Sequence, residues 1–178
     1  MNHNIENLTL GYCTNVHESK NLKKLLHTIT KTSREIKKEL SSKSSLPIGL
    51  CFNEKIAIEA EQSINFINDW INENNVKPFT INGFPQSNFQ KKIVQHSVYK
   101  PDWSTNERLE HTKRLARILS KILPEDTTEA SISTLPLGWK YPNAEEIKKK
   151  SASFILEMIN YLDYIYRETA KFIHLDLE

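Results

Sequence analysis

Apolar residues follow two different periods along the chain, and each period predicts one kind of element. Short apolar runs, typical of buried strands, cover Leu8–Cys13, Leu46–Phe52, Val76–Asn82, Ala130–Thr134 and Lys171–Leu177. Between them, apolar residues recur every three or four positions and predict amphipathic helices over Leu22–Leu40, Ile56–Ile71, Leu115–Leu123 and Ala144–Thr169. This strict alternation of strands and helices predicts an α/β protein with a parallel sheet and right-handed crossovers.

The two faces of the predicted strands differ in character, because successive side chains point to opposite faces. One face is apolar and is expected to contact the helices: Leu8, Leu10, Ile48, Leu50, Phe79, Ile81, Ile132, Leu175 and Leu177. The other face is small or polar: Thr9, Gly11, Cys13, Gly49, Cys51, Thr80, Asn82, Ser131, Ser133, His174 and Asp176. A doubly wound sheet has helices on both faces and needs apolar residues on both, whereas a barrel interior can hold polar side chains. We therefore predict a fold of the (β/α)₈ TIM-barrel type.

The length of the chain allows only part of such a barrel. Its 178 residues hold five predicted strands and four helices at about 41 residues per unit, so eight units would take roughly 330 residues. We expect residues 1–178 to form one domain, the N-terminal portion of a barrel. A half barrel has unpaired edge strands, which predicts a homo-oligomer or association with a complementing second half-barrel.

Composition narrows the classes of partner. Hydrophobic residues make up 38% of the chain, and the net charge is +2 without a basic face, which argues against nucleic acid as a partner. No apolar run is long enough for a membrane span, and the start has no signal-peptide pattern, so we expect a cytoplasmic protein. The two cysteines, Cys13 and Cys51, are expected to be free thiols.

Candidate site residues stand where the predicted strands end, because active sites of TIM barrels lie at the carboxyl ends of their strands. Asn15 and His17 follow the first strand, and Asn82 and Phe84 open a long connection that runs to Trp103. Long connections of this kind often contact a substrate, although their aromatic residues can equally serve to pack the loop. Ser133 ends the fourth strand and completes the predicted set of substrate-binding residues.

The last strand supplies the catalytic candidates. His174, Asp176 and Glu178 share one face and span about 13 Å, so they cannot all bind one ion. Glu178, nearest the mouth, is the best metal or acid/base candidate, with His174 as the second catalytic candidate. Asp176 and His174 are expected to form a buried, hydrogen-bonded polar layer below Glu178. His27 and His111 lie on predicted helices and are expected at the surface.

Five ordered stretches resemble the EboE family of metabolite traffic proteins, which are similar to the xylose isomerase-like sugar phosphate isomerase/epimerase barrels. They are Gly11–His17, Phe79–Pro85, Val98–Trp103, Ser131–Trp139 and His174–Glu178. The resemblance implies a barrel that handles a small metabolite, with no assigned reaction. In the related isomerases the acid that ends strand five is a divalent-metal ligand, and Glu178 occupies that place.

Two classes of function are compatible with these sequence features. The first is a metabolite-handling protein of the EboE type, which binds a small polar metabolite at the carboxyl ends of the strands. The alternative is a divalent-metal-dependent sugar isomerase or epimerase, the second half of which is missing, or a non-catalytic, truncated relic. A complete barrel could hold a divalent metal. Because the first four predicted strands end without acidic residues, we expect no stoichiometric metal in residues 1–178 alone.

Overall fold

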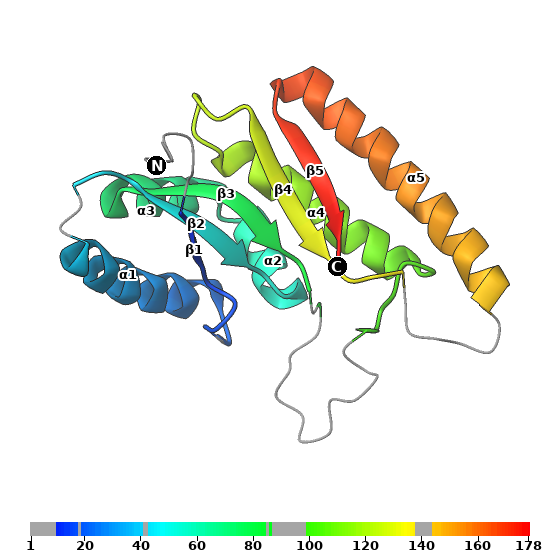
Figure 1. The fold of residues 1–178 in the computed structure, drawn as a ribbon, viewed down its shortest axis with the longest axis horizontal. Coiled ribbons are helices and arrows are strands. Elements are labelled where there is room, and N and C mark those ends of the chain that lie inside the picture. The colour runs from blue at the N-terminus through cyan, green and yellow to red at the C-terminus, as the bar shows by residue number, and fades with distance from the viewer. Residues whose placement is uncertain (1–9, 18, 41–42, 85, 87–98, 138–143) are drawn as a thin grey trace, which may run out of the picture.

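The computed structural model describes residues 10–17, 19–40, 43–84, 86, 99–137 and 144–178. Five parallel strands form one sheet in the order β1-β2-β3-β4-β5 (Figure 1). The strands are β1 (Tyr12–Cys13), β2 (Leu46–Cys51), β3 (Val76–Asn82), β4 (Glu129–Thr134) and β5 (Phe172–Leu177). The helices are α1 (Leu22–Glu39), α2 (Glu54–Glu61), α3 (Ile64–Asn74), α4 (Asn106–Ile122) and α5 (Ala144–Thr169).

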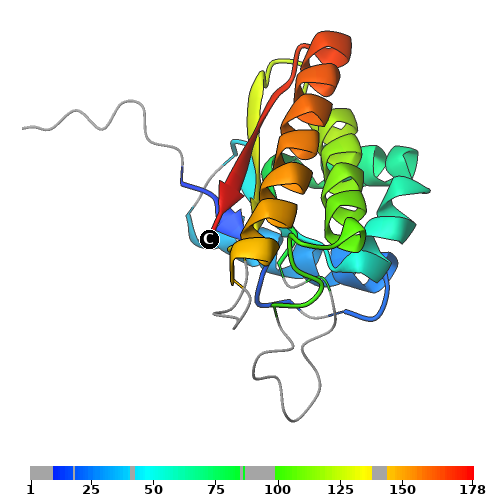
Figure 2. The same cartoon turned by 90° about the vertical axis from the view of Figure 1, so that its right-hand side faces the viewer.

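All described helices lie on one side of the sheet, and Figure 2 shows its other side uncovered. We call this uncovered side the open face. A sequential order of parallel strands with helices on one face is consistent with part of a (β/α)₈ barrel, so the predicted α/β class is confirmed. In the described part of the chain, none of the helices combines the length and apolar character that crossing a bilayer requires.

The core lies between the sheet and the helices. Ile48, Leu50, Ile81 and Ile132 are fully buried on the helix side of β2, β3 and β4, as the apolar face of the strands predicted. Leu115 and Leu119 of α4 belong to the same buried cluster. Each fully buried side chain of this size contributes about 2 kcal/mol relative to an exposed one, so this layer holds the helices on the sheet.

Two predicted elements have other bounds in the structure. The predicted helix Ile56–Ile71 is two helices, α2 and α3, because the chain turns at Gln62 and Ser63, and Ser63 occupies the N-cap position of α3. Helix α4 begins at Asn106, nine residues before the first residue of the predicted helix, Leu115. Only Tyr12 and Cys13 of the first predicted strand are described as a strand, and residues 1–9 lie outside the described residues.

Phe79 was predicted on the helix side, and this prediction is wrong. The parallel register between β2 and β3 shifts at Ile48/Gly49, so Phe79 has no partner on β2. A β-bulge of this kind directs two successive side chains, here Phe79 and Thr80, to one face. The Phe79 ring therefore reaches the open face, where a Cβ built on Gly11 would lie 2.4 Å from it.

Helix α5 buries a narrower face than the sequence predicted. The helical spacing of apolar residues predicts that six of them face inward: Phe154, Ile155, Met158, Ile159, Leu162 and Ile165. Met158, Leu162 and Ile165 are buried, but Ile159 is 51% exposed. One residue further along a helix is a rotation of about 100°, which turns Ile159 from the buried side of α5 toward solvent. Leu177, predicted on the helix side, is also 44% exposed at the free end of β5.

Candidate functional site

The carboxyl ends of the strands bring four polar side chains into one row on the open face. The parallel register pairs Cys51 with Asn82, Asn82 with Ser133, and Ser133 with Asp176. We call these four residues the upper row. Glu178 follows β5 directly and lies just beyond Asp176.

Glu178 is fixed to the end of β4 by two hydrogen bonds. The Ser133 hydroxyl donates a short hydrogen bond to Oε1 of Glu178. The backbone N–H of Glu178 donates to the carbonyl oxygen of Thr134 at 3.1 Å. The structure thus brings together two of the predicted site residues, Ser133 and Glu178, from consecutive strands.

The two cysteines are free, as predicted, and Cys51 lies close enough to this carboxylate to be affected by its charge. Burial raises the pKa of Cys51 to about 11, and the nearby charge of Glu178 and the thiol of Cys13 raise it further in the same direction. Cys51 is therefore a neutral thiol at physiological pH. A neutral, largely buried thiol is a poor nucleophile and a poor metal ligand.

A second row, which we call the lower row, lies two residues before the upper row along each strand. It consists of Gly49, Thr80, Ser131 and His174, which are neighbours in the parallel register. The Thr80 hydroxyl donates to the Ser131 carbonyl oxygen at 3.0 Å, and the Thr80 and Ser131 hydroxyl oxygens lie 2.8 Å apart. Hydroxyl groups on the open face thus bond to each other across strands.

His174 and Asp176 do not form the buried polar layer that the sequence predicted. The His174 side chain is 49% exposed and Asp176 is exposed, because no described residue covers the open face above β5. The Nε2 atom of His174 lies 3.7 Å from a Glu129 carboxylate oxygen, and its ring centroid lies 4.7 Å from that of Phe172. His174 therefore points to the same face as Glu178 without contacting it.

Asn15 and His17, two of the predicted substrate-binding residues, follow β1. His17 shares a short hydrogen bond with the Tyr12 hydroxyl, and the two rings meet edge to face at 5.9 Å. Tyr12 packs against the core and interacts with Thr32 of α1, so His17 is drawn toward the helix side. Asn15 is exposed in the turn after β1. The structure does not bring His17 together with Glu178.

The remaining predicted residues shape the end of β3. Oδ1 of Asn82 accepts a hydrogen bond from the Phe84 N–H at 2.8 Å, which turns the chain out of the strand. Phe84 packs on Tyr99, with ring centroids 5.8 Å apart. Trp103 is fully buried in the core, so it packs the connection and does not face the open side. Residues 87–98 of this connection lie outside the described residues.

A buried arginine supports this end of the sheet, and sequence reasoning missed it. Arg108 is fully buried; its Nε donates to the Pro101 carbonyl oxygen and one terminal nitrogen donates to the Gly83 carbonyl oxygen, each at 3.0 Å. Burial lowers the pKa of Arg108 to about 10, while the charges of Asp102 and Glu54 oppose this shift. Arg108 thus remains charged and ties the connection to the turn after β3.

His111 was predicted at the surface, and this prediction is wrong, since only 1% of it is exposed. His27 is exposed, as predicted. The pattern contained a signal for the buried pair: extending the stripe of Leu115 and Leu119 by helical spacing toward the N-terminus reaches His111 and Arg108. Burial, together with the charges of Arg108 and Arg114, lowers the pKa of His111 to about 3.

The donor set near Glu178 does not fit a divalent metal. Among the described residues, no three His, Cys, Asp or Glu side chains converge as ligands. One oxygen of Glu178 already accepts the Ser133 hydroxyl, and Cys51 is a neutral thiol. Mg²⁺ and Mn²⁺ favour several oxygen ligands around one ion, which this arrangement does not supply.

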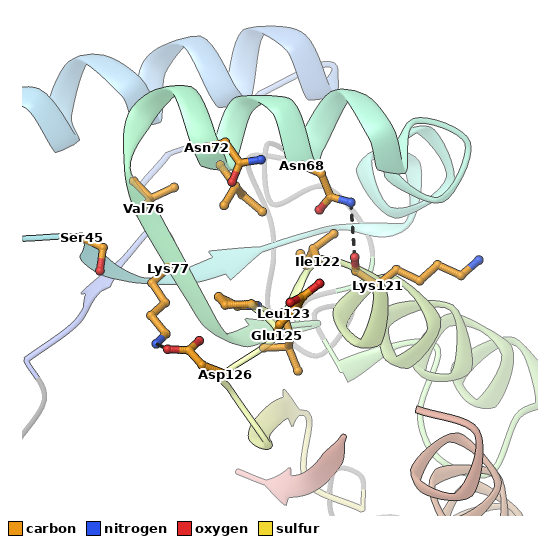
Figure 3. Close-up of a pocket in the computed structure, with 12 residues that line it drawn as sticks. Ser45, Asn68, Asn72, Val76, Lys77, Lys121, Ile122, Leu123, Glu125 and Asp126 are labelled. Atoms are coloured by element: carbon orange, nitrogen blue, oxygen red, sulfur yellow. Dashed lines mark hydrogen bonds and ion pairs between the residues drawn. The ribbon is translucent and has the colours of Figure 1, made fainter. Parts of the chain in front are cut away.

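A depression of about 640 Å³ opens at the opposite, amino-terminal end of the strands (Figure 3). Its edge carries an ion pair between Lys77 and Asp126 at 2.9 Å. Near its rim, the Asn68 amide donates to the Lys121 carbonyl oxygen at 3.4 Å. The depression lies beside the first residues of β3, so it is at the far end of the strands from the upper row. Its lining includes none of the predicted site residues.

Comparison with known proteins adds little to this geometry. No protein-family model matches the sequence, and no curated protein matches it. A solved structure, the apo crystal structure of 3-keto-D-glucoside 4-epimerase YcjR from E. coli, matches with a TM-score of 0.49 and 11% sequence identity. The match covers 94% of this chain and 55% of that chain, so the present chain spans about half the length of that structure. A match this weak carries no conclusion about the reaction.

Proposed function

We propose that this chain binds a small, polar metabolite at the upper row, as the resemblance to EboE metabolite traffic proteins implies. The observation that carries the proposal is the hydrogen-bonded pair of Ser133 and Glu178 at the carboxyl end of the sheet. This pair holds a carboxylate in a fixed position while one of its oxygens remains available. A fixed acceptor of this kind suits the hydroxyl groups of a sugar-like molecule.

The charges around the pair favour a neutral ligand over a phosphorylated one. Asp176 and Glu178 are both exposed acids at this edge, and the upper row contains no basic residue. A sugar phosphate would meet two carboxylates of like charge, whereas the hydroxyl groups of a neutral polyol would donate to them. The Asn82 amide N–H₂ can donate to the same ligand, since only its Oδ1 is used by the turn.

The test measures ¹H–¹⁵N spectral changes on titration with D-xylose and, separately, with xylose 5-phosphate. We expect weak, saturable shifts at Asn82, Ser133 and Glu178 with D-xylose and much weaker ones with the phosphate. Glu178→Gln should weaken the D-xylose response several-fold, because an uncharged amide is a poorer acceptor. Glu73→Gln, an exposed position on α3, serves as the matched control. Equal responses in the two variants, or none in the unsubstituted chain, would contradict the proposal.

A further inference from the structure

The outer edge of β5 carries unpaired backbone groups. The Phe172 N–H donates to the Thr128 carbonyl oxygen at 2.7 Å, and the Glu178 N–H donates to that of Thr134 at 3.1 Å. Since alternate residues of a strand direct their backbone groups to opposite sides, Ile173, Leu175 and Leu177 direct theirs away from β4. In the described part of the chain β5 pairs with β4 alone, and Figure 2 shows its outer side beside α5 and uncovered.

This edge lacks most of the devices that usually protect exposed strands, and its one formally charged side chain is Asp176 on the open face. Protected edges carry proline, an outward lysine or a bulge, and β5 has none of these in its sequence or in its register with β4. The nearest lysine, Lys171, is turned inward and donates to the carbonyl oxygens of Pro124, Glu125 and Thr127. An unprotected strand of six residues is a template for pairing with another strand.

The edge is complementary to itself when a second copy runs antiparallel about Leu175. In this register Leu175 faces Leu175 of the second copy, and Ile173 faces Leu177. These are the residues whose N–H and C=O groups point outward, so each of these pairs exchanges two backbone hydrogen bonds. Leu175 is therefore a position where backbone groups point outward and where a two-fold axis can pass between the two strands.

Charge complementarity favours this register over the neighbouring registers of the two β5 strands. With Leu175 at the centre, His174 faces Asp176 of the second copy, and the symmetry repeats the pair. These are non-hydrogen-bonded positions, where side chains approach most closely. Moving the centre by one residue would place His174 opposite His174, or Asp176 opposite Asp176. Centring on Asp176 would also place His174 opposite Glu178, but only the Leu175 register joins an imidazole to a carboxylate twice without setting two like side chains of this face against each other.

The exposed face of α5 extends the same surface. Leu156, Ile159 and Tyr166 are each about half exposed or more, and the Tyr166 ring meets that of Phe172 at 5.9 Å. Figure 1 shows α5 running alongside β5 at the end of the sheet. A two-fold axis through Leu175 would bring two copies of this apolar stripe toward each other and remove both from water.

We propose that this chain forms a two-fold dimer through antiparallel pairing of its β5 edges, centred on Leu175. Sedimentation velocity over micromolar concentrations should show a reversible monomer–dimer equilibrium. His174→Asp puts a carboxylate opposite Asp176 twice and should weaken dimerisation by about tenfold or more. His174→Lys at the same position should preserve the dimer, and the double variant His174→Asp/Asp176→Lys should restore it.

The register itself is tested by cross-linking. In a Cys13→Ser/Cys51→Ser background, mixing the His174→Cys and Asp176→Cys variants should give a disulfide-linked heterodimer on mild oxidation, because non-hydrogen-bonded pairs lie within disulfide reach. Glu73→Lys, a charge reversal on α3, should leave dimerisation unchanged, and circular dichroism checks that each variant is folded. A monomer at all concentrations, or a dimer that withstands His174→Asp and gives no cross-link, would overturn the proposal. So would capture of a parallel strand from a different protein at this edge.

Discussion

At the scale of single residues, the buried imidazole of His111 makes the stability of the protein depend on pH. Burial holds its folded-state pKa near 3, well below the ordinary value of 6.5. Below pH 6.5 the unfolded chain takes up a proton that the folded chain does not, so stability falls as pH falls from about 6.5 toward 3. The slope from this one group approaches about 1.4 kcal/mol per pH unit.

His111→Leu should remove this acid sensitivity. Within the described part of the chain neither ring nitrogen of His111 makes a well-aligned hydrogen bond, so replacing the imidazole with an apolar side chain should not decrease stability at pH 7. Urea unfolding at pH 7 and pH 5 measures both effects, and His27→Leu, at an exposed position, is the control. An unchanged pH slope in the His111→Leu variant would show that the imidazole is not buried in its neutral form.

Gly49 on the open face is required for close packing between neighbouring strands. A Cβ at this position would lie 2.9 Å from Cγ2 of Thr80 and 3.0 Å from Sγ of Cys13. Gly49→Ala should therefore destabilise the fold by about 1–3 kcal/mol. Adding Thr80→Ser removes the methyl group and keeps the hydroxyl bonded to Ser131, so the double variant should recover most of the loss. Thermal unfolding of the two variants decides whether the contact limits the packing.

At the scale of elements, one lysine joins β5 to the segment before β4. The Lys171 ammonium donates to the carbonyl oxygens of Pro124, Glu125 and Thr127 at 2.8, 3.0 and 2.6 Å. Hydrogen bonds from a charged donor are stronger than neutral ones, and all three oxygens would lose their donor together.

Lys171→Met should therefore cost about 1–3 kcal/mol in the free energy of unfolding. Lys150→Met removes an exposed pair with Glu146 on α5 and should change stability by less than about 0.5 kcal/mol. Urea denaturation compares the two variants. Similar values for both would show that the loop before β4 does not depend on the ammonium.

At the scale of the whole molecule, five strands and their helices leave the site with ligands from one side only. Among the described residues, Glu178 is the one carboxylate that accepts a hydrogen bond from the Ser133 hydroxyl. We therefore predict that residues 1–178 alone hold far less than one equivalent of Mg²⁺, Mn²⁺ or Zn²⁺ per chain after dialysis, because a single carboxylate binds such ions weakly. Elemental analysis measures this. One equivalent, lost in the Glu178→Gln variant, would refute the prediction and support a metal-dependent enzyme.

The spacing of apolar residues was enough to predict the alternation of strands and helices, except that the predicted helix Ile56–Ile71 is two helices, α2 and α3. The bounds of Val76–Asn82 and Ala144–Thr169 agree with the structure, and the helix-facing residues Ile48, Leu50, Ile81 and Ile132 are buried. These features can be predicted because strands and helices each require a characteristic spacing of apolar residues along the chain. The placement of small and polar residues on the other face followed from the same alternation.

The contacts between side chains of different elements, and the exposure of the site residues, could not be predicted from local patterns. The bulge at Phe79 and the exposure of His174 depend on how neighbouring strands align, which the spacing of residues within one strand does not show. The burial of Arg108 and His111 agrees with helical spacing, but their contacts depend on how α4 packs against the end of β3. The bond between Ser133 and Glu178 joins residues 45 positions apart and exists because β4 and β5 are parallel in one register. Local patterns define elements, but a site is made by the register and packing between elements that are distant in sequence.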